Sequence, residues 1–396
     1  MLSRNNSFAL RIIQMSFSVV ILLTILLFCV FQFTYFIFCA KGVSVRTRDM
    51  FLASGYIALT ICVSVLYYHV FCVRYVDADR MYQEMENALY KGNGYLFELY
   101  GINPFSALLI LLPALVGLPY LIKSIAAFVY FGCMFLLAWK LRKKFSPVSI
   151  FLAVLFLLCT LDLSYPADGI RFPMACMIFC SALVLNKYNN LSRINTTVLV
   201  LIACLLHVSF WPFFVLFIIT PLLGKEKFAL VAFCCLFYFP FVVSFSSVIA
   251  KFNPSLGWKM QLYFEVGGQY YQDLISKEQI AFLLFIYLFC ILLIIYGLKK
   301  GIVEYDLYIK YCIIFSSITL GSIPSNVMFP RYAPIIILMA FPLVSTIFSY
   351  YTSTGKRKGI LVKDKSIHFV FFAFLVVVFG SIILRCTFSY AVFYVA

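Results

Sequence analysis

Long apolar runs separated by short polar loops constrain this chain more than any other feature. Each run approaches the roughly 20 residues that a helix needs to cross a bilayer core. The runs lie near residues 12–38, 50–72, 122–139, 147–162, 172–187, 195–207, 210–223, 228–250, 279–298, 304–322, 332–350 and 368–392. Backbone polar groups must be satisfied internally in hydrocarbon, which favours helices. The sequence therefore predicts an all-α, polytopic integral membrane protein with about 12 transmembrane helices in a single domain, residues 1–396.

The composition supports this class and excludes several others. The chain is 64% hydrophobic and only 12% charged, whereas soluble domains are about 25% charged. The 14 cysteines fall almost entirely within apolar runs, without metal-ligand spacing, so we expect buried thiols, no metal site and no cofactor. Gly267-Gly268 lacks the third glycine of a nucleotide-binding loop, and no Walker motif is present, which argues against a nucleotide-driven pump.

The net charge of +16 is distributed along the chain in a way that predicts membrane topology rather than nucleic-acid binding. Basic residues cluster in six short loops, which we assign to the cytoplasm: 41–48, 140–144, 187–193, 225–227, 299–300 and 356–365. The intervening loops carry mixed charge and are assigned to the far side: 74–103, 162–172, 251–278 and 324–331. Loops 74–103 and 251–278 are therefore expected to be periplasmic.

The alternation of loops identifies an irregular stretch. Residues 104–140 must make an odd number of crossings but are too few for three full spans. Pro113, Gly117 and Pro119 interrupt the first half, so the sequence predicts a short or re-entrant helix near 104–119. Such backbone is tolerated at membrane depth only against protein or a water-filled cavity.

The acidic loop 74–103 is the first candidate site. Asp77 and Asp79 stand near its start, and a surface helix is predicted over residues 79–90. One face of that helix is expected to carry Met81, Met85, Ala88 and Leu89. An ordinary solvated loop would look similar, but a carboxylate beside a cavity can act as a general base or orient a hydroxyl.

Three further residues stand where predicted far-side loops meet apolar runs. Arg171 follows Asp168 at the start of one run, and Arg331 opens another. An arginine there could simply extend to water, but its guanidinium could also bind phosphate oxygens through two hydrogen bonds. His207 ends an apolar run and is either a structural hydrogen-bonding residue or part of the same site.

The order of these residues resembles a known family. The marks are Arg74-Tyr75, Asp79 and Tyr82, then Gly169-Ile170-Arg171 with Ala175, then Leu206-His207-Val208-Ser209, and finally Arg331-Tyr332. Spread over roughly residues 60–340, they resemble the EpsG/Wzy-like group of bacterial polysaccharide polymerases. The acidic outer loop followed by a short Pro-containing helix is also similar to that of GT-C glycosyltransferases.

The resemblance implies polymerisation of undecaprenyl-pyrophosphate-linked oligosaccharide units by a multi-pass protein of the bacterial inner membrane. Its partners would be that substrate, membrane lipids, and a flippase and chain-length regulator of the same pathway, with no nucleic acid. Arg171 and Arg331 would clamp the pyrophosphate, and Asp79 or Asp77 would activate the acceptor, with His207 as a third catalytic candidate. The remaining substrate-binding candidates are Arg74, Glu98, Tyr82 and Asp168.

Other functions remain open at the level of sequence. A flippase for the same lipid-linked units would also be polytopic with buried arginines, but would need no carboxylate at the substrate. A GT-C glycosyltransferase that uses polyprenyl-phosphate sugars would have the same acidic loop and could use a divalent metal. An O-antigen ligase would normally carry a larger late loop than 251–278.

Overall fold

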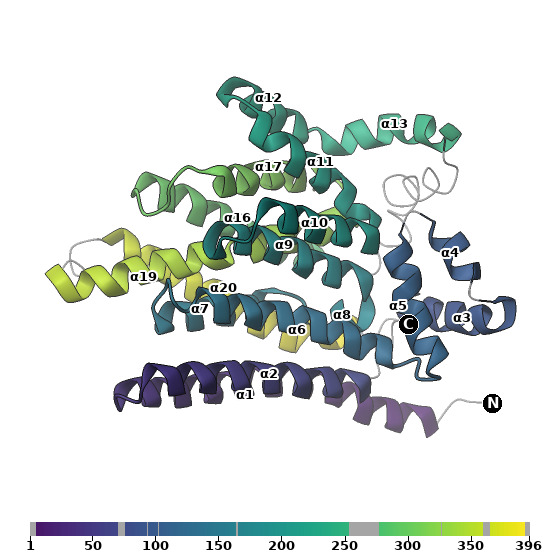
Figure 1. Cartoon of the computed structure of the whole chain (residues 1–396), viewed down its shortest axis with the longest axis horizontal. Coiled ribbons are helices and arrows are strands. Elements are labelled where there is room, and N and C mark those ends of the chain that lie inside the picture. The colour runs from purple at the N-terminus through teal and green to yellow at the C-terminus, as the bar shows by residue number, and fades with distance from the viewer. Residues whose placement is uncertain are drawn as a thin grey trace. The chain divides into compact units, whose positions relative to one another are not determined.

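The structure is a computed structural model that describes residues 5–69, 76–92, 94–101, 103–163, 165–252, 277–325, 327–358 and 365–392. The regular elements in these residues are α-helices and short 3₁₀ segments, with no strand among them (Figure 1). This confirms the predicted all-α class. Internal contacts divide the chain into two compact units, one formed by Met1–Trp211 with Val378–Ala396 and the other by Pro212–Val377.

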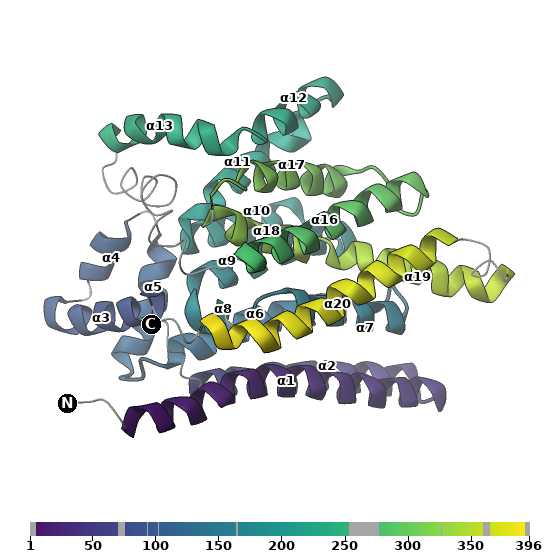
Figure 2. The ribbon, with the colours of Figure 1, turned by 180° about the vertical axis from the view of Figure 1, so that it is seen from behind.

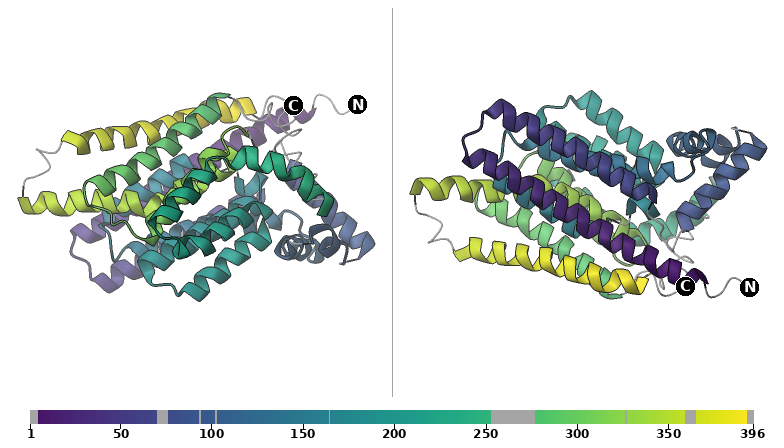
Figure 3. Two further views of the ribbon diagram at one scale, coloured as in Figure 1. Left: turned by 90° about the horizontal axis from the view of Figure 1, so that it is seen from above. Right: turned by 90° about the horizontal axis from the view of Figure 1, so that it is seen from below.

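The first unit combines long helices with a group of short ones. Its elements are α1 (Asn5–Ala40), α2 (Val45–His69), α3 (Val76–Lys91), α4 (Gly94–Tyr100), α5 (Pro104–Leu115), α6 (Leu121–Leu141), α7 (Pro147–Thr160), α8 (Tyr165–Asp168), α9 (Arg171–Asn189), α10 (Arg193–Leu206) and η1 (Val208–Phe210). Helices α1 and α2 run side by side, and α6 packs on both α2 and α9 (Figures 1 and 2). Helices α3, α4 and α5 gather at one end of the long helices (Figure 3).

The second unit is built around α18. Its elements are α11 (Trp211–Ile219, from Pro212 on), η2 (Thr220–Leu222), α12 (Lys225–Cys235), α13 (Tyr238–Phe252), α16 (Lys277–Lys299), α17 (Leu307–Gly321), α18 (Met328–Met339), α19 (Phe341–Lys358) and the first part of α20 (Lys365–Val392). Helices α16, α17 and α19 all pack on α18, where Tyr332 is completely buried.

A bend separates α12 from α13, and α17 approaches closely at the same point. The two helices meet at 65°, at a break next to Cys235. A Cβ atom at Gly321 of α17 would lie only 2.3 Å from the Cys235 carbonyl oxygen. Only glycine fits at this position, because any side chain would push the two backbones apart.

The described residues contain fewer helices of spanning length than the sequence predicts. Helices long and apolar enough to cross a bilayer number six among the described residues, or seven if the bent pair α12 and α13 is one span. The six are Ile21–Ala40, Val45–Tyr68, Leu121–Leu141, Lys277–Lys299, Met328–Thr352 and Ile367–Leu384. The predicted number of about 12 is therefore not confirmed.

Helix length explains part of the difference. The expected spans 147–162 and 195–207 are α7 and α10, each of 14 residues. Such helices rise roughly 21 Å, which is less than the roughly 30 Å hydrocarbon core. The short helix expected near 104–119 is present as α5, which continues past Pro113 to Leu115 and ends before Gly117.

Helix starts differ in how they are capped. Ser146, Ser192 and Asp306 cap α7, α10 and α17, and each side chain accepts a hydrogen bond from the main-chain N–H three residues ahead. Such caps satisfy N–H groups that have no partner inside the helix. Helices α5 and α9 have no side-chain cap, and main-chain carbonyls take its place: the N–H groups of Ser106 and Phe172 donate to the Asn103 and Gly169 carbonyls.

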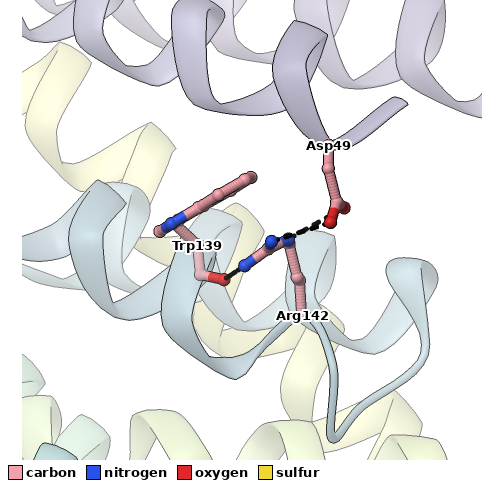
Figure 4. Close-up of polar contacts among 3 residues, drawn as sticks. All are labelled: Asp49, Trp139 and Arg142. Carbon is pink, nitrogen blue, oxygen red and sulfur yellow. Dashed lines mark hydrogen bonds and ion pairs between the residues drawn. The ribbon is translucent and has the colours of Figure 1, made fainter. Parts of the chain in front are cut away.

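A polar clamp joins α2 to α6 at the end carrying the basic loops (Figure 4). Arg142 donates from Nε and Nη2 to the two carboxylate oxygens of Asp49, at 2.9 and 2.8 Å. A third bond runs from Nη1 to the Trp139 carbonyl, and the guanidinium lies over the Trp139 ring. The fork geometry thus uses most donors of the arginine.

This clamp predicts a stability effect. Arg142→Gln should lower the free energy of unfolding by about 1–2 kcal/mol, between the values typical of exposed and buried ion pairs. Thermal unfolding of the purified protein in detergent measures the loss. Lys143→Gln is the matched control, because Lys143 is an exposed neighbour. Equal shifts for both variants would show that the clamp adds no stability.

Candidate functional site

Helix α3 contributes one buried face to the candidate site. Met81, Met85 and Ala88 are at most 3% exposed and pack in a core with α4, α5 and α6. Leu89, expected on the same face, is 63% exposed. It follows Ala88 by one residue and is therefore rotated by about 100° out of the buried stripe. The predicted amphipathic helix is present, but its apolar face is narrower than expected.

Glu84 lies on the buried face of α3 and has two partners. It is 8% exposed, and its Oε2 accepts a hydrogen bond of 2.5 Å from the Tyr100 hydroxyl. Its Oε1 lies 3.3 Å from Nε of Arg80, one turn earlier on the same helix. A buried carboxylate requires such partners, because an unpaired charge would be costly there. Glu84 therefore ties α3 to the end of α4.

Tyr100 is held as a hydrogen-bond donor. Burial raises the pKa of its phenol above the ordinary value of about 10; the Arg171 charge lowers this pKa, and Glu84 raises it. Since the net shift is upward, the hydroxyl keeps its proton across physiological pH. It can therefore donate to Glu84 continuously.

Arg171 is the first residue of α9, as the sequence predicts. Its guanidinium carbon lies 4.9 Å from the centroid of the Tyr100 ring, within cation–π range. The side chain is partly buried, and its Nε is buried without a hydrogen-bond partner. The preceding Ile170 has φ 34°, ψ −69°, a conformation that a β-branched residue rarely adopts. A strained backbone at this position is typical of functional sites.

A second buried polar atom, Oδ1 of Asn103, also lacks a hydrogen-bond partner. Asn103 precedes α5, is 6% exposed, and has a buried Oδ1 that makes no hydrogen bond. Its main-chain N–H donates to the Tyr100 carbonyl, which joins the start of α5 to the end of α4. Buried polar atoms are nearly always hydrogen-bonded. Arg171 Nε and Asn103 Oδ1 are therefore two exceptions in the first unit.

His207 ends α10 and packs beside Arg171's neighbour. Its ring meets Phe172 edge-on, with centroids 5.3 Å apart. Its Nδ1 accepts a hydrogen bond of 3.2 Å from the Ser209 main-chain N–H. The neutral ring therefore carries its proton on Nε2. The carbonyl of the preceding residue, Leu206, accepts a hydrogen bond of 2.6 Å from the Ser106 hydroxyl of α5. This bond joins α5 to α10.

An aromatic pair with a buried lysine adjoins α3. Tyr82 meets Tyr120 edge-on, with centroids 5.4 Å apart. Lys123, in the first turn of α6, is 1% exposed and holds its Nζ 4.8 Å from the Tyr120 ring centroid. Of these residues, the sequence analysis identified only Tyr82.

Most of the other predicted site residues have side chains outside the part of the chain that the structure describes. Arg74 lies outside the described residues, as do the side chains of Asp77, Asp79 and Asp168; the backbones of these aspartates belong to α3 and α8. Glu98 is exposed on α4. Loop 251–278 also falls outside the described residues, apart from its ends.

Arg331 belongs to the second unit. It is partly buried near the start of α18, next to Tyr332. The Tyr332 hydroxyl is 3.1 Å from that of Tyr238, and its ring packs edge-on against Phe213 at 4.8 Å. Its position at the beginning of a helix within the candidate span Met328–Thr352 agrees with the sequence expectation.

Three residues of the site in the first unit were not predicted from the sequence: Glu84, Tyr100 and Lys123. Lys123 could have been found, because it is a lone charge in an apolar run and such charges are rarely idle. Glu84 shares the helical face of Met81 and Ala88, which also indicates burial. Tyr100 carries no local pattern that distinguishes it from the other tyrosines.

Among the described residues, no three His, Cys, Asp or Glu side chains gather as a metal-binding group. Apolar helices long enough to cross a bilayer define an α-helical membrane protein. The chain belongs to the EpsG family, whose sequence model matches residues 57–392. No curated protein and no solved structure matches it. Membership in this family indicates a polysaccharide polymerase-like function in a membrane.

Proposed function

We propose that this protein joins undecaprenyl-pyrophosphate-linked oligosaccharide units into a polysaccharide at the periplasmic face of the bacterial inner membrane. The observation that carries the proposal is Arg171, whose buried Nε lacks a partner at the uncapped start of α9. Guanidinium groups favour phosphate oxygens, which they bind through two parallel N–H groups. A pyrophosphate on a lipid carrier presents these oxygens at the membrane surface.

The reaction is a glycosyl transfer between two lipid-linked glycans. A hydroxyl oxygen of the acceptor bonds to the anomeric carbon of the donor, and the bond from that carbon to the pyrophosphate oxygen breaks. The lipid pyrophosphate leaves with the bonding electrons, and the hydroxyl proton passes to a carboxylate. We assign that carboxylate to Asp79 or Asp77, at the start of α3.

The arginines would stabilise the leaving group. Arg171 and Arg331 would hold pyrophosphate oxygens as negative charge develops there, which is electrostatic catalysis. No nucleotide or metal is needed for this step. Arg74, Asp168, Glu98 and Tyr82 are proposed to contact the substrate elsewhere. His207 fits a supporting role, because its Nδ1 is occupied and Nε2 is then a donor rather than a base.

A reconstitution experiment tests the function directly. Purified protein in liposomes, given only lipid-linked repeat units, should lengthen them without nucleotide sugar, ATP or added metal. Gel separation of the products measures chain length, with protein-free liposomes as the control. Units that cross the liposome membrane but are never joined would indicate a flippase. Extension only with a polyprenyl-phosphate sugar and a divalent metal would indicate a GT-C glycosyltransferase instead.

A further inference from the structure

We infer that Glu84 is a positioning residue for glycosyl transfer, which acts through Tyr100 to hold Arg171 with its Nε edge turned toward the pyrophosphate. The inference rests on the proposed function and adds residues that the sequence analysis did not assign to the site. It concerns three helices of one unit, α3, α4 and α9.

The contacts form a continuous chain. The Glu84 carboxylate accepts the Tyr100 hydroxyl at 2.5 Å, and the Tyr100 ring lies 4.9 Å from the guanidinium carbon of Arg171. Both oxygens of Glu84 are engaged, since Arg80 approaches the second one at 3.3 Å. A carboxylate with both oxygens engaged orients its neighbours and is poorly placed to accept a substrate proton.

Packing makes the Glu84–Tyr100–Arg171 contacts rigid. Tyr100 is 8% exposed and belongs to an apolar cluster with Leu96, Ile170 and Met174. The cluster confines the ring, and the bond to Glu84 fixes how far the ring reaches toward α9. A guanidinium packed on that ring loses little further freedom when it binds an anion, which favours affinity through preorganisation.

The unpartnered atom specifies which edge of the arginine binds. A guanidinium binds an oxyanion through two parallel N–H groups, and one of its edges consists of Nε and an Nη. Nε of Arg171 is buried and makes no hydrogen bond, so its N–H still requires an acceptor, and we assign that acceptor to the ligand. A lysine has no equivalent edge.

The Glu84–Tyr100–Arg171 contacts also link the residue that activates the acceptor to the residue that binds the leaving group. Asp79, the proposed base, lies on α3 with Glu84, and Arg171 lies on α9. The Glu84–Tyr100–Arg171 contacts therefore fix the helix of the acceptor group relative to the helix that holds the leaving group. Near-attack geometry depends on such spacing, and small displacements reduce turnover rather than binding.

The test compares Tyr100→Phe and Glu84→Gln in the reconstituted extension reaction. Each should lower kcat about tenfold and change KM less than about threefold, because the lost alignment matters most as charge develops on the leaving group. The double variant should fall no further than about twofold below either single variant, because both residues act through one contact chain. Tyr90→Phe and Glu86→Gln are matched controls, since both residues are exposed on α3.

A second measurement separates positioning from folding. In an Arg171→Lys background, Tyr100→Phe should change the residual rate less than about twofold, because the lysine no longer uses the aligned edge. A purely structural Tyr100 would lower activity equally in both backgrounds and would overturn the inference. Full activity of Tyr100→Phe would overturn it too, while leaving wild-type extension, and hence the proposed function, intact. Tyr100→Phe keeps the buried ring and therefore decides the matter even if Glu84→Gln does not fold.

Discussion

Arg171→Ala is expected to leave the protein inserted in the membrane while chain growth stops and single-unit product accumulates. Loss of one group that stabilises developing charge costs about 10²–10³ in turnover. Arg171→Lys should restore little of this activity, because an ammonium cannot form the two parallel bonds of a guanidinium. Gel analysis of polysaccharide from cells that carry only the variant protein measures the effect.

Arg193→Ala provides the control for this substitution. Arg193 is also the first residue of a helix, but it is exposed, and the preceding Ser192 caps that helix. Its removal should leave the chain-length distribution unchanged. Full-length polysaccharide in the Arg171→Ala strain, with normal protein level, would contradict the role of Arg171 in the reaction.

Asp79→Asn is expected to block joining but not delivery of the lipid-linked units. The amide is nearly isosteric with the carboxylate but cannot accept the hydroxyl proton. Loss of a positioned base costs about 10²–10⁴-fold, which removes long chains from a gel. Lipid-linked units should still reach the periplasm, where a lectin or labelling enzyme can detect them. Asp77→Asn should be milder, because Asp79 is nearer in sequence to Tyr82.

The aspartate variants separate a transferase from a flippase, which arginine variants cannot do. Both classes would bind pyrophosphate through arginines, but only a transferase must activate a hydroxyl. Glu86→Gln is the control, because Glu86 is an exposed carboxylate on the same helix. If Asp79→Asn forms polymer at the wild-type rate, Asp79 is not the base. If the variant instead stops units from reaching the periplasm, the flippase interpretation gains support.

Local pattern was enough to predict single elements of the site. The helix over residues 79–90, the short helix after Pro104, and the position of Arg171 at a helix start follow from periodicity, proline placement and the cost of charge in apolar runs. These features depend on neighbours within a few residues, which is the range over which sequence periodicity carries information.

Long-range contacts could not be predicted in the same way. Tyr100 meets Glu84 and Arg171 because α3, α4 and α9 pack together, and no periodicity in one helix specifies its partner on another. The predicted number of about 12 spans is not confirmed for a related reason. Apolar runs such as 147–162 show that a helix is buried, but hydropathy does not distinguish burial in lipid from burial in protein.

The contacts around Arg171 also have a consequence for the order of events during synthesis. Residues Glu84, Tyr100, Ser106, Arg171 and His207 all precede Pro212, where the second unit begins. Ribosomes add roughly 5–20 residues per second, so these side chains have all been made roughly 10–40 s before residue 396 is added. The contacts around Arg171 can therefore form before the C-terminal half is translated.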